Sequence, residues 1–378
     1  MAARKVYFDN SATTRIAPEV LDAMMPFLTE EYGNPSSIHF MGDAAAKGVR
    51  IARKQVADSL GSLPSEITFT SGGTESDNLA LIGVMTAMRA DGSPRKRIIT
   101  TAIEHEAVLE ACEELRRRGF EVTVLGVDKE GYLDPSVLDD AMGDDVAMVS
   151  VMAANNVVGT IEDIPELSKV AHEHGALFHT DAVQGYTKMK IDVKKDGIDL
   201  LALSGHKVHA PKGIGALYVR SGVPILPINF GGGQERGLRS STENVPGIIG
   251  LGKAAELAMS TMDEDIRMMT KLRDEIIDDM LSLRGVHLNG PVGDRRLCNN
   301  THFRFDGGKG LDTVIKLSKE GIAASAASAC SAGSSEPSYV LTALGLSPEQ
   351  CLSALRISLS RYNTEDDVHY LKEVMSRF

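Results

Sequence analysis

The sequence is poor in cysteine: its 378 residues include only Cys112, Cys298, Cys330 and Cys351. None of the four forms a C-x-x-C pair, which argues against a zinc site or a dithiol redox motif. Single, scattered cysteines in a chain of this length are typical of a reduced, cytoplasmic protein. The chain also lacks an apolar run long enough to span a bilayer, and its first ten residues lack the apolar segment of a signal peptide.

An excess of positive charge is missing as well. The chain has 40 Lys and Arg residues against 52 Asp and Glu residues, a net charge of −12. This balance argues against general binding to nucleic-acid phosphates or to anionic lipid. The hydrophobic share of 43% is that of an ordinary globular protein, and the length suits a large domain plus a smaller one.

Short apolar runs alternate with helical patterns over about residues 18–253. The clearest runs cover residues 67–71, 97–101, 122–125, 146–152, 176–181 and 200–204. This alternation predicts an α/β fold with a mostly parallel central sheet and helices on both faces. A further strand at 214–219 follows its predecessor so closely that it could be antiparallel.

The pattern changes at about residue 259. The expected elements there are a long charged helix at 263–283, strands near 286–289 and 302–305, and helices near 311–320 and 364–376. We therefore expect a large α/β domain over residues 14–258. A small α+β domain would combine residues 1–13 with residues 259–378.

Polar residues recur directly after the predicted strands. The first strand leads into Ser-Gly-Gly-Thr-Glu-Ser at 71–76 and then a helix, an arrangement that offers free N–H groups to an anion. A tight turn with a Thr N-cap explains this segment equally well. The segment matches neither G-x-x-x-x-G-K-[ST] nor G-x-G-x-x-G, so a nucleotide-binding protein is the weakest interpretation.

Other strand ends carry His105, Asn156, Asp181 and Gln184. Each residue alone is better explained by a capping or turn role. Together they indicate one site, because ligands of open α/β sheets bind at the carboxyl ends of the strands. An Asp that ends an apolar strand is also partly desolvated and requires a cationic or N–H partner.

The next strand end carries Ser-Gly-His-Lys at 204–207. The amine of Lys207, placed there near cationic or apolar groups, could lose its proton and attack a carbonyl. Pyridoxal phosphate requires a lysine that forms a Schiff base, a carboxylate for its pyridine nitrogen and donors for its phosphate. The combined set therefore predicts a site for this cofactor, with His105 as a planar group that could stack on the ring.

Two further residues are candidates for chemistry. Cys330 is the only reactive side chain in residues 323–335, a stretch of Ala, Ser and Gly that we expect to form a mobile loop. This setting favours a reactive thiol over a passive small residue, whereas Cys112 and Cys351 lie on helical patterns and are expected to pack. Arg356 alternates with apolar residues and fits either a substrate carboxylate or an internal salt bridge.

The motifs resemble those of the NifS/IscS-type cysteine desulfurases, and they run in order from residue 7 to about 368. The matching segments are Tyr-Phe-Asp-Asn-Ser-Ala-Thr-Thr at 7–14, Gly-Asn-Pro-Ser-Ser at 33–37, Thr-Ser-Gly-Gly-Thr-Glu-Ser-Asp-Asn at 70–78, Glu-His at 104–105, Asp-Ala-Val-Gln at 181–184, Ser-Gly-His-Lys at 204–207, Gly-Gly-Gly-Gln-Glu-Arg-Gly-Leu-Arg-Ser at 231–240, Ser-Ala-Cys-Ser at 328–331, Glu-Pro-Ser-Tyr-Val-Leu at 336–341 and Arg-Ile-Ser-Leu at 356–359. The long loop around Cys330 is that of the group I branch.

The resemblance implies a homodimeric fold-type I pyridoxal-phosphate enzyme that converts L-cysteine to L-alanine and carries the sulfur as a persulfide on Cys330. Lys207 would form the Schiff base and later move the proton, and Asp181 would pair with the pyridine nitrogen. The other implied roles are stacking and proton transfer by His105, contact with the phenolic oxygen by Gln184, phosphate binding by Gly73, Thr74, Ser204 and His206, phosphate binding in the neighbouring subunit by Thr242, a place beside cofactor and substrate for Asn156, and substrate carboxylate binding by Arg356.

The implied acceptor is a sulfur-accepting protein such as an iron–sulfur scaffold, and Cys330 could contact a transferred cluster; no resident metal is expected. The chain departs from the family at Val157, Ala210 and Ser241, which are expected around the active site. The resemblance also leads us to expect that the longer C-terminal tail, which helps relatives bind the scaffold, is absent. Two alternatives remain at this point: a selenocysteine lyase or other fold-type I enzyme, and a sulfur-relay partner with little turnover.

Overall fold

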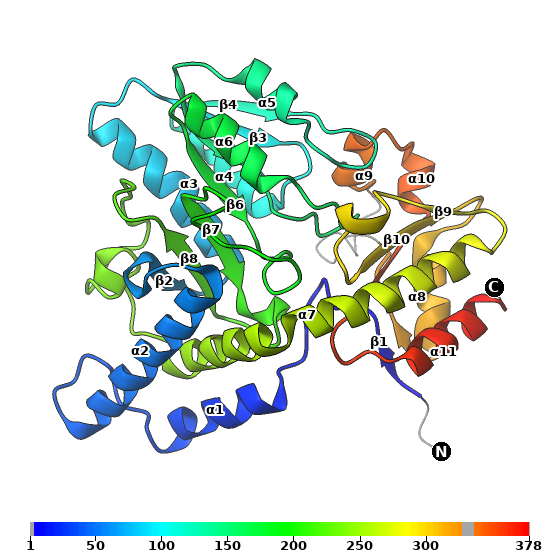
Figure 1. Cartoon of the computed structure of the whole chain (residues 1–378), viewed down its shortest axis with the longest axis horizontal. Helices are drawn as coiled ribbons and strands as arrows, with labels where there is room; N and C mark the ends of the chain where they lie inside the picture. The colour runs from blue at the N-terminus through cyan, green and yellow to red at the C-terminus, as the bar shows by residue number, and fades with distance from the viewer. Residues whose placement is uncertain (1–3, 327–335, 378) are drawn as a thin grey trace.

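The computed structural model describes residues 4–326 and 336–377, and its largest element is a seven-stranded sheet. The strands follow the order β2-β8-β7-β6-β5-β3-β4 (Figure 1). Their bounds are β2 Ile67–Thr70, β3 Arg97–Thr101, β4 Glu121–Leu125, β5 Val146–Ser150, β6 Leu177–Asp181, β7 Leu200–Ser204 and β8 Gly215–Val219. The pairings from β7 through β4 are parallel, and β8 is antiparallel to both β7 and β2. The predicted mostly parallel sheet is confirmed.

Helices cover both faces of this sheet, as the alternating pattern predicts. They are α1 Pro18–Thr29, α2 Phe40–Leu60, α3 Gly73–Ala90, α4 Glu106–Arg117, α5 Pro135–Ala141 and α6 Ile164–Glu173. Neighbouring residues of β7 pack into two separate hydrophobic cores on opposite faces of the sheet. Leu200 packs with residues of α3 and α4, whereas Leu201 packs with residues of α2 and α6. Strands buried on both faces explain why the apolar runs are continuous rather than alternating.

A second, three-stranded antiparallel sheet has the order β12-β10-β9. Its strands are β9 Val286–Leu288, β10 Asn300–Phe305 and β12 Ala354–Ser358; the helices nearby in sequence are α8 Gly310–Lys319, α9 Tyr339–Ala343, α10 Pro348–Leu352 and α11 Glu365–Met375. The N-terminal strand β1 (Val6–Tyr7) pairs in parallel with β11 (Ile322–Ala323). The start of the chain therefore lies beside segments more than 300 residues away.

One long helix, α7 (Val245–Leu281), runs from the large sheet to the small one (Figure 1). The expected helix start at 263 is wrong, because α7 begins 18 residues earlier. Its first half is rich in glycine, which weakens a helical pattern. Gly252 is needed for close packing, since a Cβ there would lie 2.5 Å from Ala52 Cα of α2. The predicted domain boundary at 258/259 falls inside this continuous helix and remains a prediction.

In the described part of the chain, no helix combines the length and the apolar character needed to cross a membrane.

Candidate active site

A cavity of about 260 Å³ lies at the carboxyl ends of β6 and β7. Its lining includes ten residues that the sequence singles out: Gly73, Thr74, His105, Asn156, Asp181, Gln184, Ser204, His206, Lys207 and Arg356. Residues from β6, β7, β12 and the starts of α3 and α4 thus converge on one space. Thr242 is exposed and does not line this cavity, and Cys330 lies outside the described residues.

Lys207 ends a short 3-10 turn that directly follows the buried strand β7. Its Nζ donates hydrogen bonds to the carbonyl oxygens of Ser11 and Ala12, at 2.6 and 2.8 Å. These two acceptors hold the amine at the cavity wall. Sequence reasoning missed them, because a backbone carbonyl has no residue-type signal.

Asp181 is the last residue of β6 and is 5% exposed. Its Oδ1 accepts the Val183 N–H at 2.8 Å. Burial raises the pKa of Asp181, and the opposing influences are His105, the Val183 amide and Lys207. A buried carboxyl whose ionised form is favoured by a nearby N–H group and the Lys207 amine is suited to pair with a protonated ring nitrogen.

His105 is the N-cap of α4, and its Nδ1 accepts the Ala107 N–H at 3.1 Å. That bond leaves Nε2 as the ring nitrogen that carries the proton. Gln184 donates from Nε2 to the Ser11 carbonyl at 3.0 Å. Among the described residues, the buried oxygens Gln184 Oε1 and Asn156 Oδ1 have no hydrogen-bond partner. A polar ligand in the cavity would satisfy these atoms.

The end of the cavity beside the start of α3 is suited to bind an anion. Helix α3 begins at Gly73 and no side chain caps it, so the Thr N-cap alternative is wrong: Thr74 lies inside the helix. The first N–H groups of a helix have no intrahelical acceptor. Ser204 and His206 border the same space, and burial, with Lys207 and Lys212, lowers the pKa of His206 to about 4.

Arg356, on β12, is 1% exposed and reaches the cavity from the small sheet. Its Nη2 pairs with Asp9 Oδ1 at 3.0 Å, and its Nη1 donates to the Asn156 carbonyl at 2.8 Å. The internal salt bridge considered for this residue therefore exists. Arg356 also lines the cavity, so a substrate carboxylate bound there would share the guanidinium group with Asp9.

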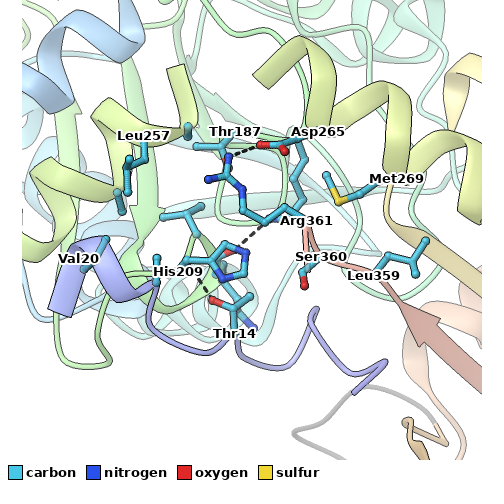
Figure 2. A pocket seen from close by; sticks show the side chains of 16 residues that line it. Thr14, Val20, Thr187, His209, Leu257, Asp265, Met269, Leu359, Ser360 and Arg361 are labelled. Carbon is cyan, nitrogen blue, oxygen red and sulfur yellow. Dashed lines mark hydrogen bonds and ion pairs between the residues drawn. The ribbon is translucent and has the colours of Figure 1, made fainter. Parts of the chain in front are cut away.

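A much smaller cavity of about 30 Å³ lies behind Lys207, where α7, the N-terminal segment and the 207–209 turn meet (Figure 2). His209 has a left-handed backbone with φ of 66°, and its N–H donates to Thr14 Oγ1 at 2.9 Å. Arg361 pairs with Asp265 of α7. The bond to Thr14 helps to hold a non-glycine residue in a strained conformation two positions after Lys207.

The three departures from the family pattern do not form part of the cavity wall. Val157, Ala210 and Ser241 are absent from the residues that line the main cavity, although Val157 directly follows Asn156, which lines it. Val157 packs in an apolar cluster with Ile103 and Leu341, and its N–H donates to Asn155 Oδ1 at 2.9 Å. That these positions surround the active site remains a prediction.

Comparisons with known proteins agree over nearly the full chain. The family model described as Aminotransferase class-V matches residues 6–371. A cysteine desulfurase IscS of Methanosarcina thermophila is 50% identical over 372 residues, which cover 98% of this chain and 91% of the relative. A solved structure titled NifS-like protein has a TM-score of 0.92 at 40% identity and 99% coverage of both chains. The structure of SspA in complex with cysteine has a TM-score of 0.82 at 37% identity and covers 95% of this chain and all of its own.

Proposed function

Because this chain belongs to the class-V aminotransferase family and is a pyridoxal-phosphate-dependent cysteine desulfurase, we propose that the 260 Å³ cavity is its active site. The observation that carries this assignment is the convergence of the Lys207 amine, the Asp181 carboxyl and the uncapped start of α3 on one space. Three groups of different chemistry are thus arranged around a volume suited to a small aromatic phosphate ester.

The residues present fit the cofactor. Lys207 would bind its aldehyde carbon, and Asp181 would pair with its ring nitrogen. The N–H groups at Gly73 and Thr74, with the side chains of Ser204 and His206, would hold the phosphate. The buried, unsatisfied oxygens of Gln184 and Asn156 would gain partners from polar groups on the ring or the substrate.

When bound, pyridoxal phosphate supplies an electron-withdrawing ring that makes the substrate Cα acidic. The protein residues then divide the remaining work. Lys207 accepts and returns the proton at Cα, and the Ser11 and Ala12 carbonyls orient its amine toward the cavity. His105, which lines the cavity, would pack against the ring, and its Nε2 would carry the proton that it can transfer. Arg356 orients the substrate carboxylate.

The sulfur is transferred to Cys330. The Cys330 thiolate attacks the substrate sulfur, an S–S bond forms, and the C–S bond of the substrate breaks. The three-carbon product gains a proton and leaves as alanine, while the persulfide remains for delivery to an acceptor protein. An iron–sulfur scaffold is one such acceptor. A free thiol of this kind requires a reducing compartment, so we expect a cytoplasmic reaction.

The enzyme is proposed to act as a homodimer. Thr242 is exposed and separate from the cavity of its own chain, which leaves it free to reach a phosphate in a neighbouring subunit. Large apolar side chains between α1 and α2 support an interface: Ile38 is 100% exposed and Phe40 is 80% exposed. Exposed apolar side chains in such a cluster mark interaction surfaces.

The decisive experiment compares Cys330→Ser with the wild-type protein, with L-cysteine as substrate. We expect the variant to keep the visible absorbance of bound cofactor and to lose sulfide production almost completely, because only the sulfur acceptor is removed. Cys351→Ser is the matched control, because it makes the same change in a buried cysteine that does not line the cavity. Full sulfide production by Cys330→Ser would contradict the role of Cys330, and wild-type protein that forms no alanine would contradict the proposed function.

A further inference from the structure

A second carboxyl group, that of Asp77, lines the same cavity as Asp181 and has no role so far. Asp77 is the fifth residue of α3, so it lies about one turn beyond Gly73 on the same face of the helix. Its side chain is only 1% exposed. Burying an anionic carboxylate is costly unless a partner stabilises the charge, so the protonation state of Asp77 requires an explanation.

The nearest ionisable partner of Asp77 is a buried histidine of β6. Asp77 Oδ1 lies 3.5 Å from His179 Nε2, and neither atom has a hydrogen-bond partner among the described residues. The other ring nitrogen, His179 Nδ1, lies 2.8 Å from Ser150 Oγ. His179 precedes Asp181 by two residues on the strand, so both side chains leave the same face of the sheet. The pair therefore lies next to the carboxyl that is proposed to hold the ring nitrogen.

The contact between Asp77 and His179 joins two neutral groups. Burial lowers the pKa of His179 to about 3, so its imidazole is uncharged at neutral pH. Burial also raises the pKa of Asp77 well above its usual value, and the neighbouring carboxyl groups of Asp181 and Glu104 raise it further. Both effects favour the protonated form of Asp77, and the unpartnered Nε2 of His179, 3.5 Å from Oδ1, is the ring atom that its proton would face.

The neighbouring carboxyls differ from Asp77 in what surrounds them. Burial raises the pKa of Asp181, but His105, the Val183 amide and Lys207 all oppose that rise and favour its ionised form. Glu104 is 0% exposed and does not line the cavity; burial raises its pKa to about 8, against the N–H of Met152. Between Asp181 and Asp77, which both line the cavity, Asp181 has neighbours that favour its ionised form, whereas burial and both neighbouring carboxyls raise the pKa of Asp77.

We propose that Asp77 is the proton-exchanging carboxyl of the cofactor cavity: it holds a proton beside His179 in the protein alone and releases it when a protonated ring nitrogen pairs with Asp181. This inference rests on the proposed function of the cavity. A positive charge nearby favours the ionised form of a carboxyl. The O–H bond of Asp77 breaks, and its proton passes to solvent. One proton that the protein carried is therefore released when the cofactor binds.

Isothermal titration of the apoprotein with pyridoxal phosphate, near neutral pH and in two buffers of different ionisation enthalpy, counts the protons released. Asp77→Asn preserves the shape of the side chain but has no proton to release. We expect the variant to release about one proton per subunit fewer than the wild type. Equal proton counts would overturn the proposal.

Glu104→Gln is the matched control. Its carboxyl is just as buried but is held by the Thr101 hydroxyl at 2.7 Å and the Met152 N–H at 3.0 Å, away from the cavity. We expect this variant to keep the wild-type proton count. A decrease equal to that of Asp77→Asn would assign the proton to the carboxyl cluster as a whole and overturn the specific role of Asp77.

Visible absorbance of bound cofactor separates this proposal from the proposed function. Wild-type protein without that absorbance contradicts the proposed function, whereas bound cofactor with equal proton counts contradicts only the role of Asp77. A measurement on wild-type protein covers the case in which Asp77→Asn does not fold. Infrared difference spectra of protein labelled with ¹³C-aspartate should lose the carbonyl band of a protonated aspartate on cofactor binding, and an unchanged band would overturn the proposal.

Discussion

Lys188 buries an ammonium group behind the cofactor cavity. Its Nζ donates to the carbonyl oxygens of Gln184 and Lys207, both at 3.2 Å, and the residue is 8% exposed. Cys298 donates from Sγ to the Lys188 carbonyl at 3.5 Å. Because both acceptors of the ammonium belong to residues that line the cavity, Lys188 joins the segment after β6 to the turn after β7. We infer that it is a positioning residue.

Lys188→Met should change both the pH dependence of protein stability and the affinity for the cofactor, and the two effects can be measured separately. Burial lowers the pKa of Lys188 to about 8, so the unfolded chain binds more protons than the folded protein between pH 8 and the ordinary lysine pKa of roughly 10.4. The free energy of unfolding of the wild type therefore increases as pH rises through this window. The variant has no amine at position 188 and should not show this increase. Chemical denaturation at several pH values measures the difference in the free energy of unfolding.

The same variant should bind cofactor about tenfold more weakly, since it loses charge-assisted hydrogen bonds to two backbone carbonyls. Lys190→Met provides the control, because the Lys190 side chain is 77% exposed and pairs with a surface carboxylate, Asp263. Unchanged cofactor affinity in Lys188→Met would mean that the carbonyls of Gln184 and Lys207 keep their positions without the ammonium.

At the scale of secondary structure, the close contact between the start of α3 and the turn after β6 determines the shape of the phosphate end. A Cβ on Gly73 would lie 2.7 Å from Val183 Cγ2 and 3.6 Å from Ser204 Cβ. Gly73→Ala should therefore move the first turn of α3 away from the cavity. Overpacking of this kind costs about 1–3 kcal/mol, and we expect cofactor affinity to fall about tenfold or more in an absorbance titration.

Gly126→Ala is the matched control for that substitution. A Cβ at Gly126 meets no described atom within 4 Å, and its φ lies outside the left-handed region. The control should bind cofactor as the wild type does. Normal cofactor affinity in Gly73→Ala would contradict the prediction. It would mean that the Val183 side chain moves aside while the N–H groups at the start of α3 keep their positions.

The sequence predicts the large sheet well because its strands are buried on both faces and are read as continuous apolar runs. It also predicts ten residues of the cavity, because each follows a strand end or matches a family motif. It does not single out Asp77, whose only local signal is an acidic residue four positions after Gly73 in a helix that otherwise turns apolar. It misses the Ser11 and Ala12 carbonyls because any residue type could supply them.

For the whole molecule, the contacts that complete the site are long-range in sequence. Arg356 pairs with Asp9 across 347 positions and donates to the Asn156 carbonyl across 200. Such pairings depend on how β12 and the N-terminal segment come together, and periodicity within a single element carries no information about them. For this reason the sequence leaves a substrate clamp and an internal salt bridge equally open at Arg356, whereas the structure contains the salt bridge at the cavity wall.

The exposed apolar side chains between α1 and α2 lead to a prediction for the assembly. Tyr32, Ile38 and Phe40 are 73%, 100% and 80% exposed, at the end of the molecule where α1 and α2 meet their connecting loop (Figure 1). If this surface forms the homodimer interface, Phe40→Asp should bury a charge there and shift the protein toward monomer in light scattering at micromolar concentration.

Leu311→Asp controls for the loss of an exposed apolar residue elsewhere, because Leu311 is 53% exposed on α8 near the small sheet. We expect this variant to remain dimeric and Phe40→Asp to lose cofactor together with its partner subunit, since Thr242 would no longer reach a neighbouring phosphate. Cofactor content measured alongside molar mass tests that link. A Phe40→Asp protein that keeps the dimer mass would place the interface on another surface, and a monomer with full cofactor content would remove Thr242 from the phosphate site.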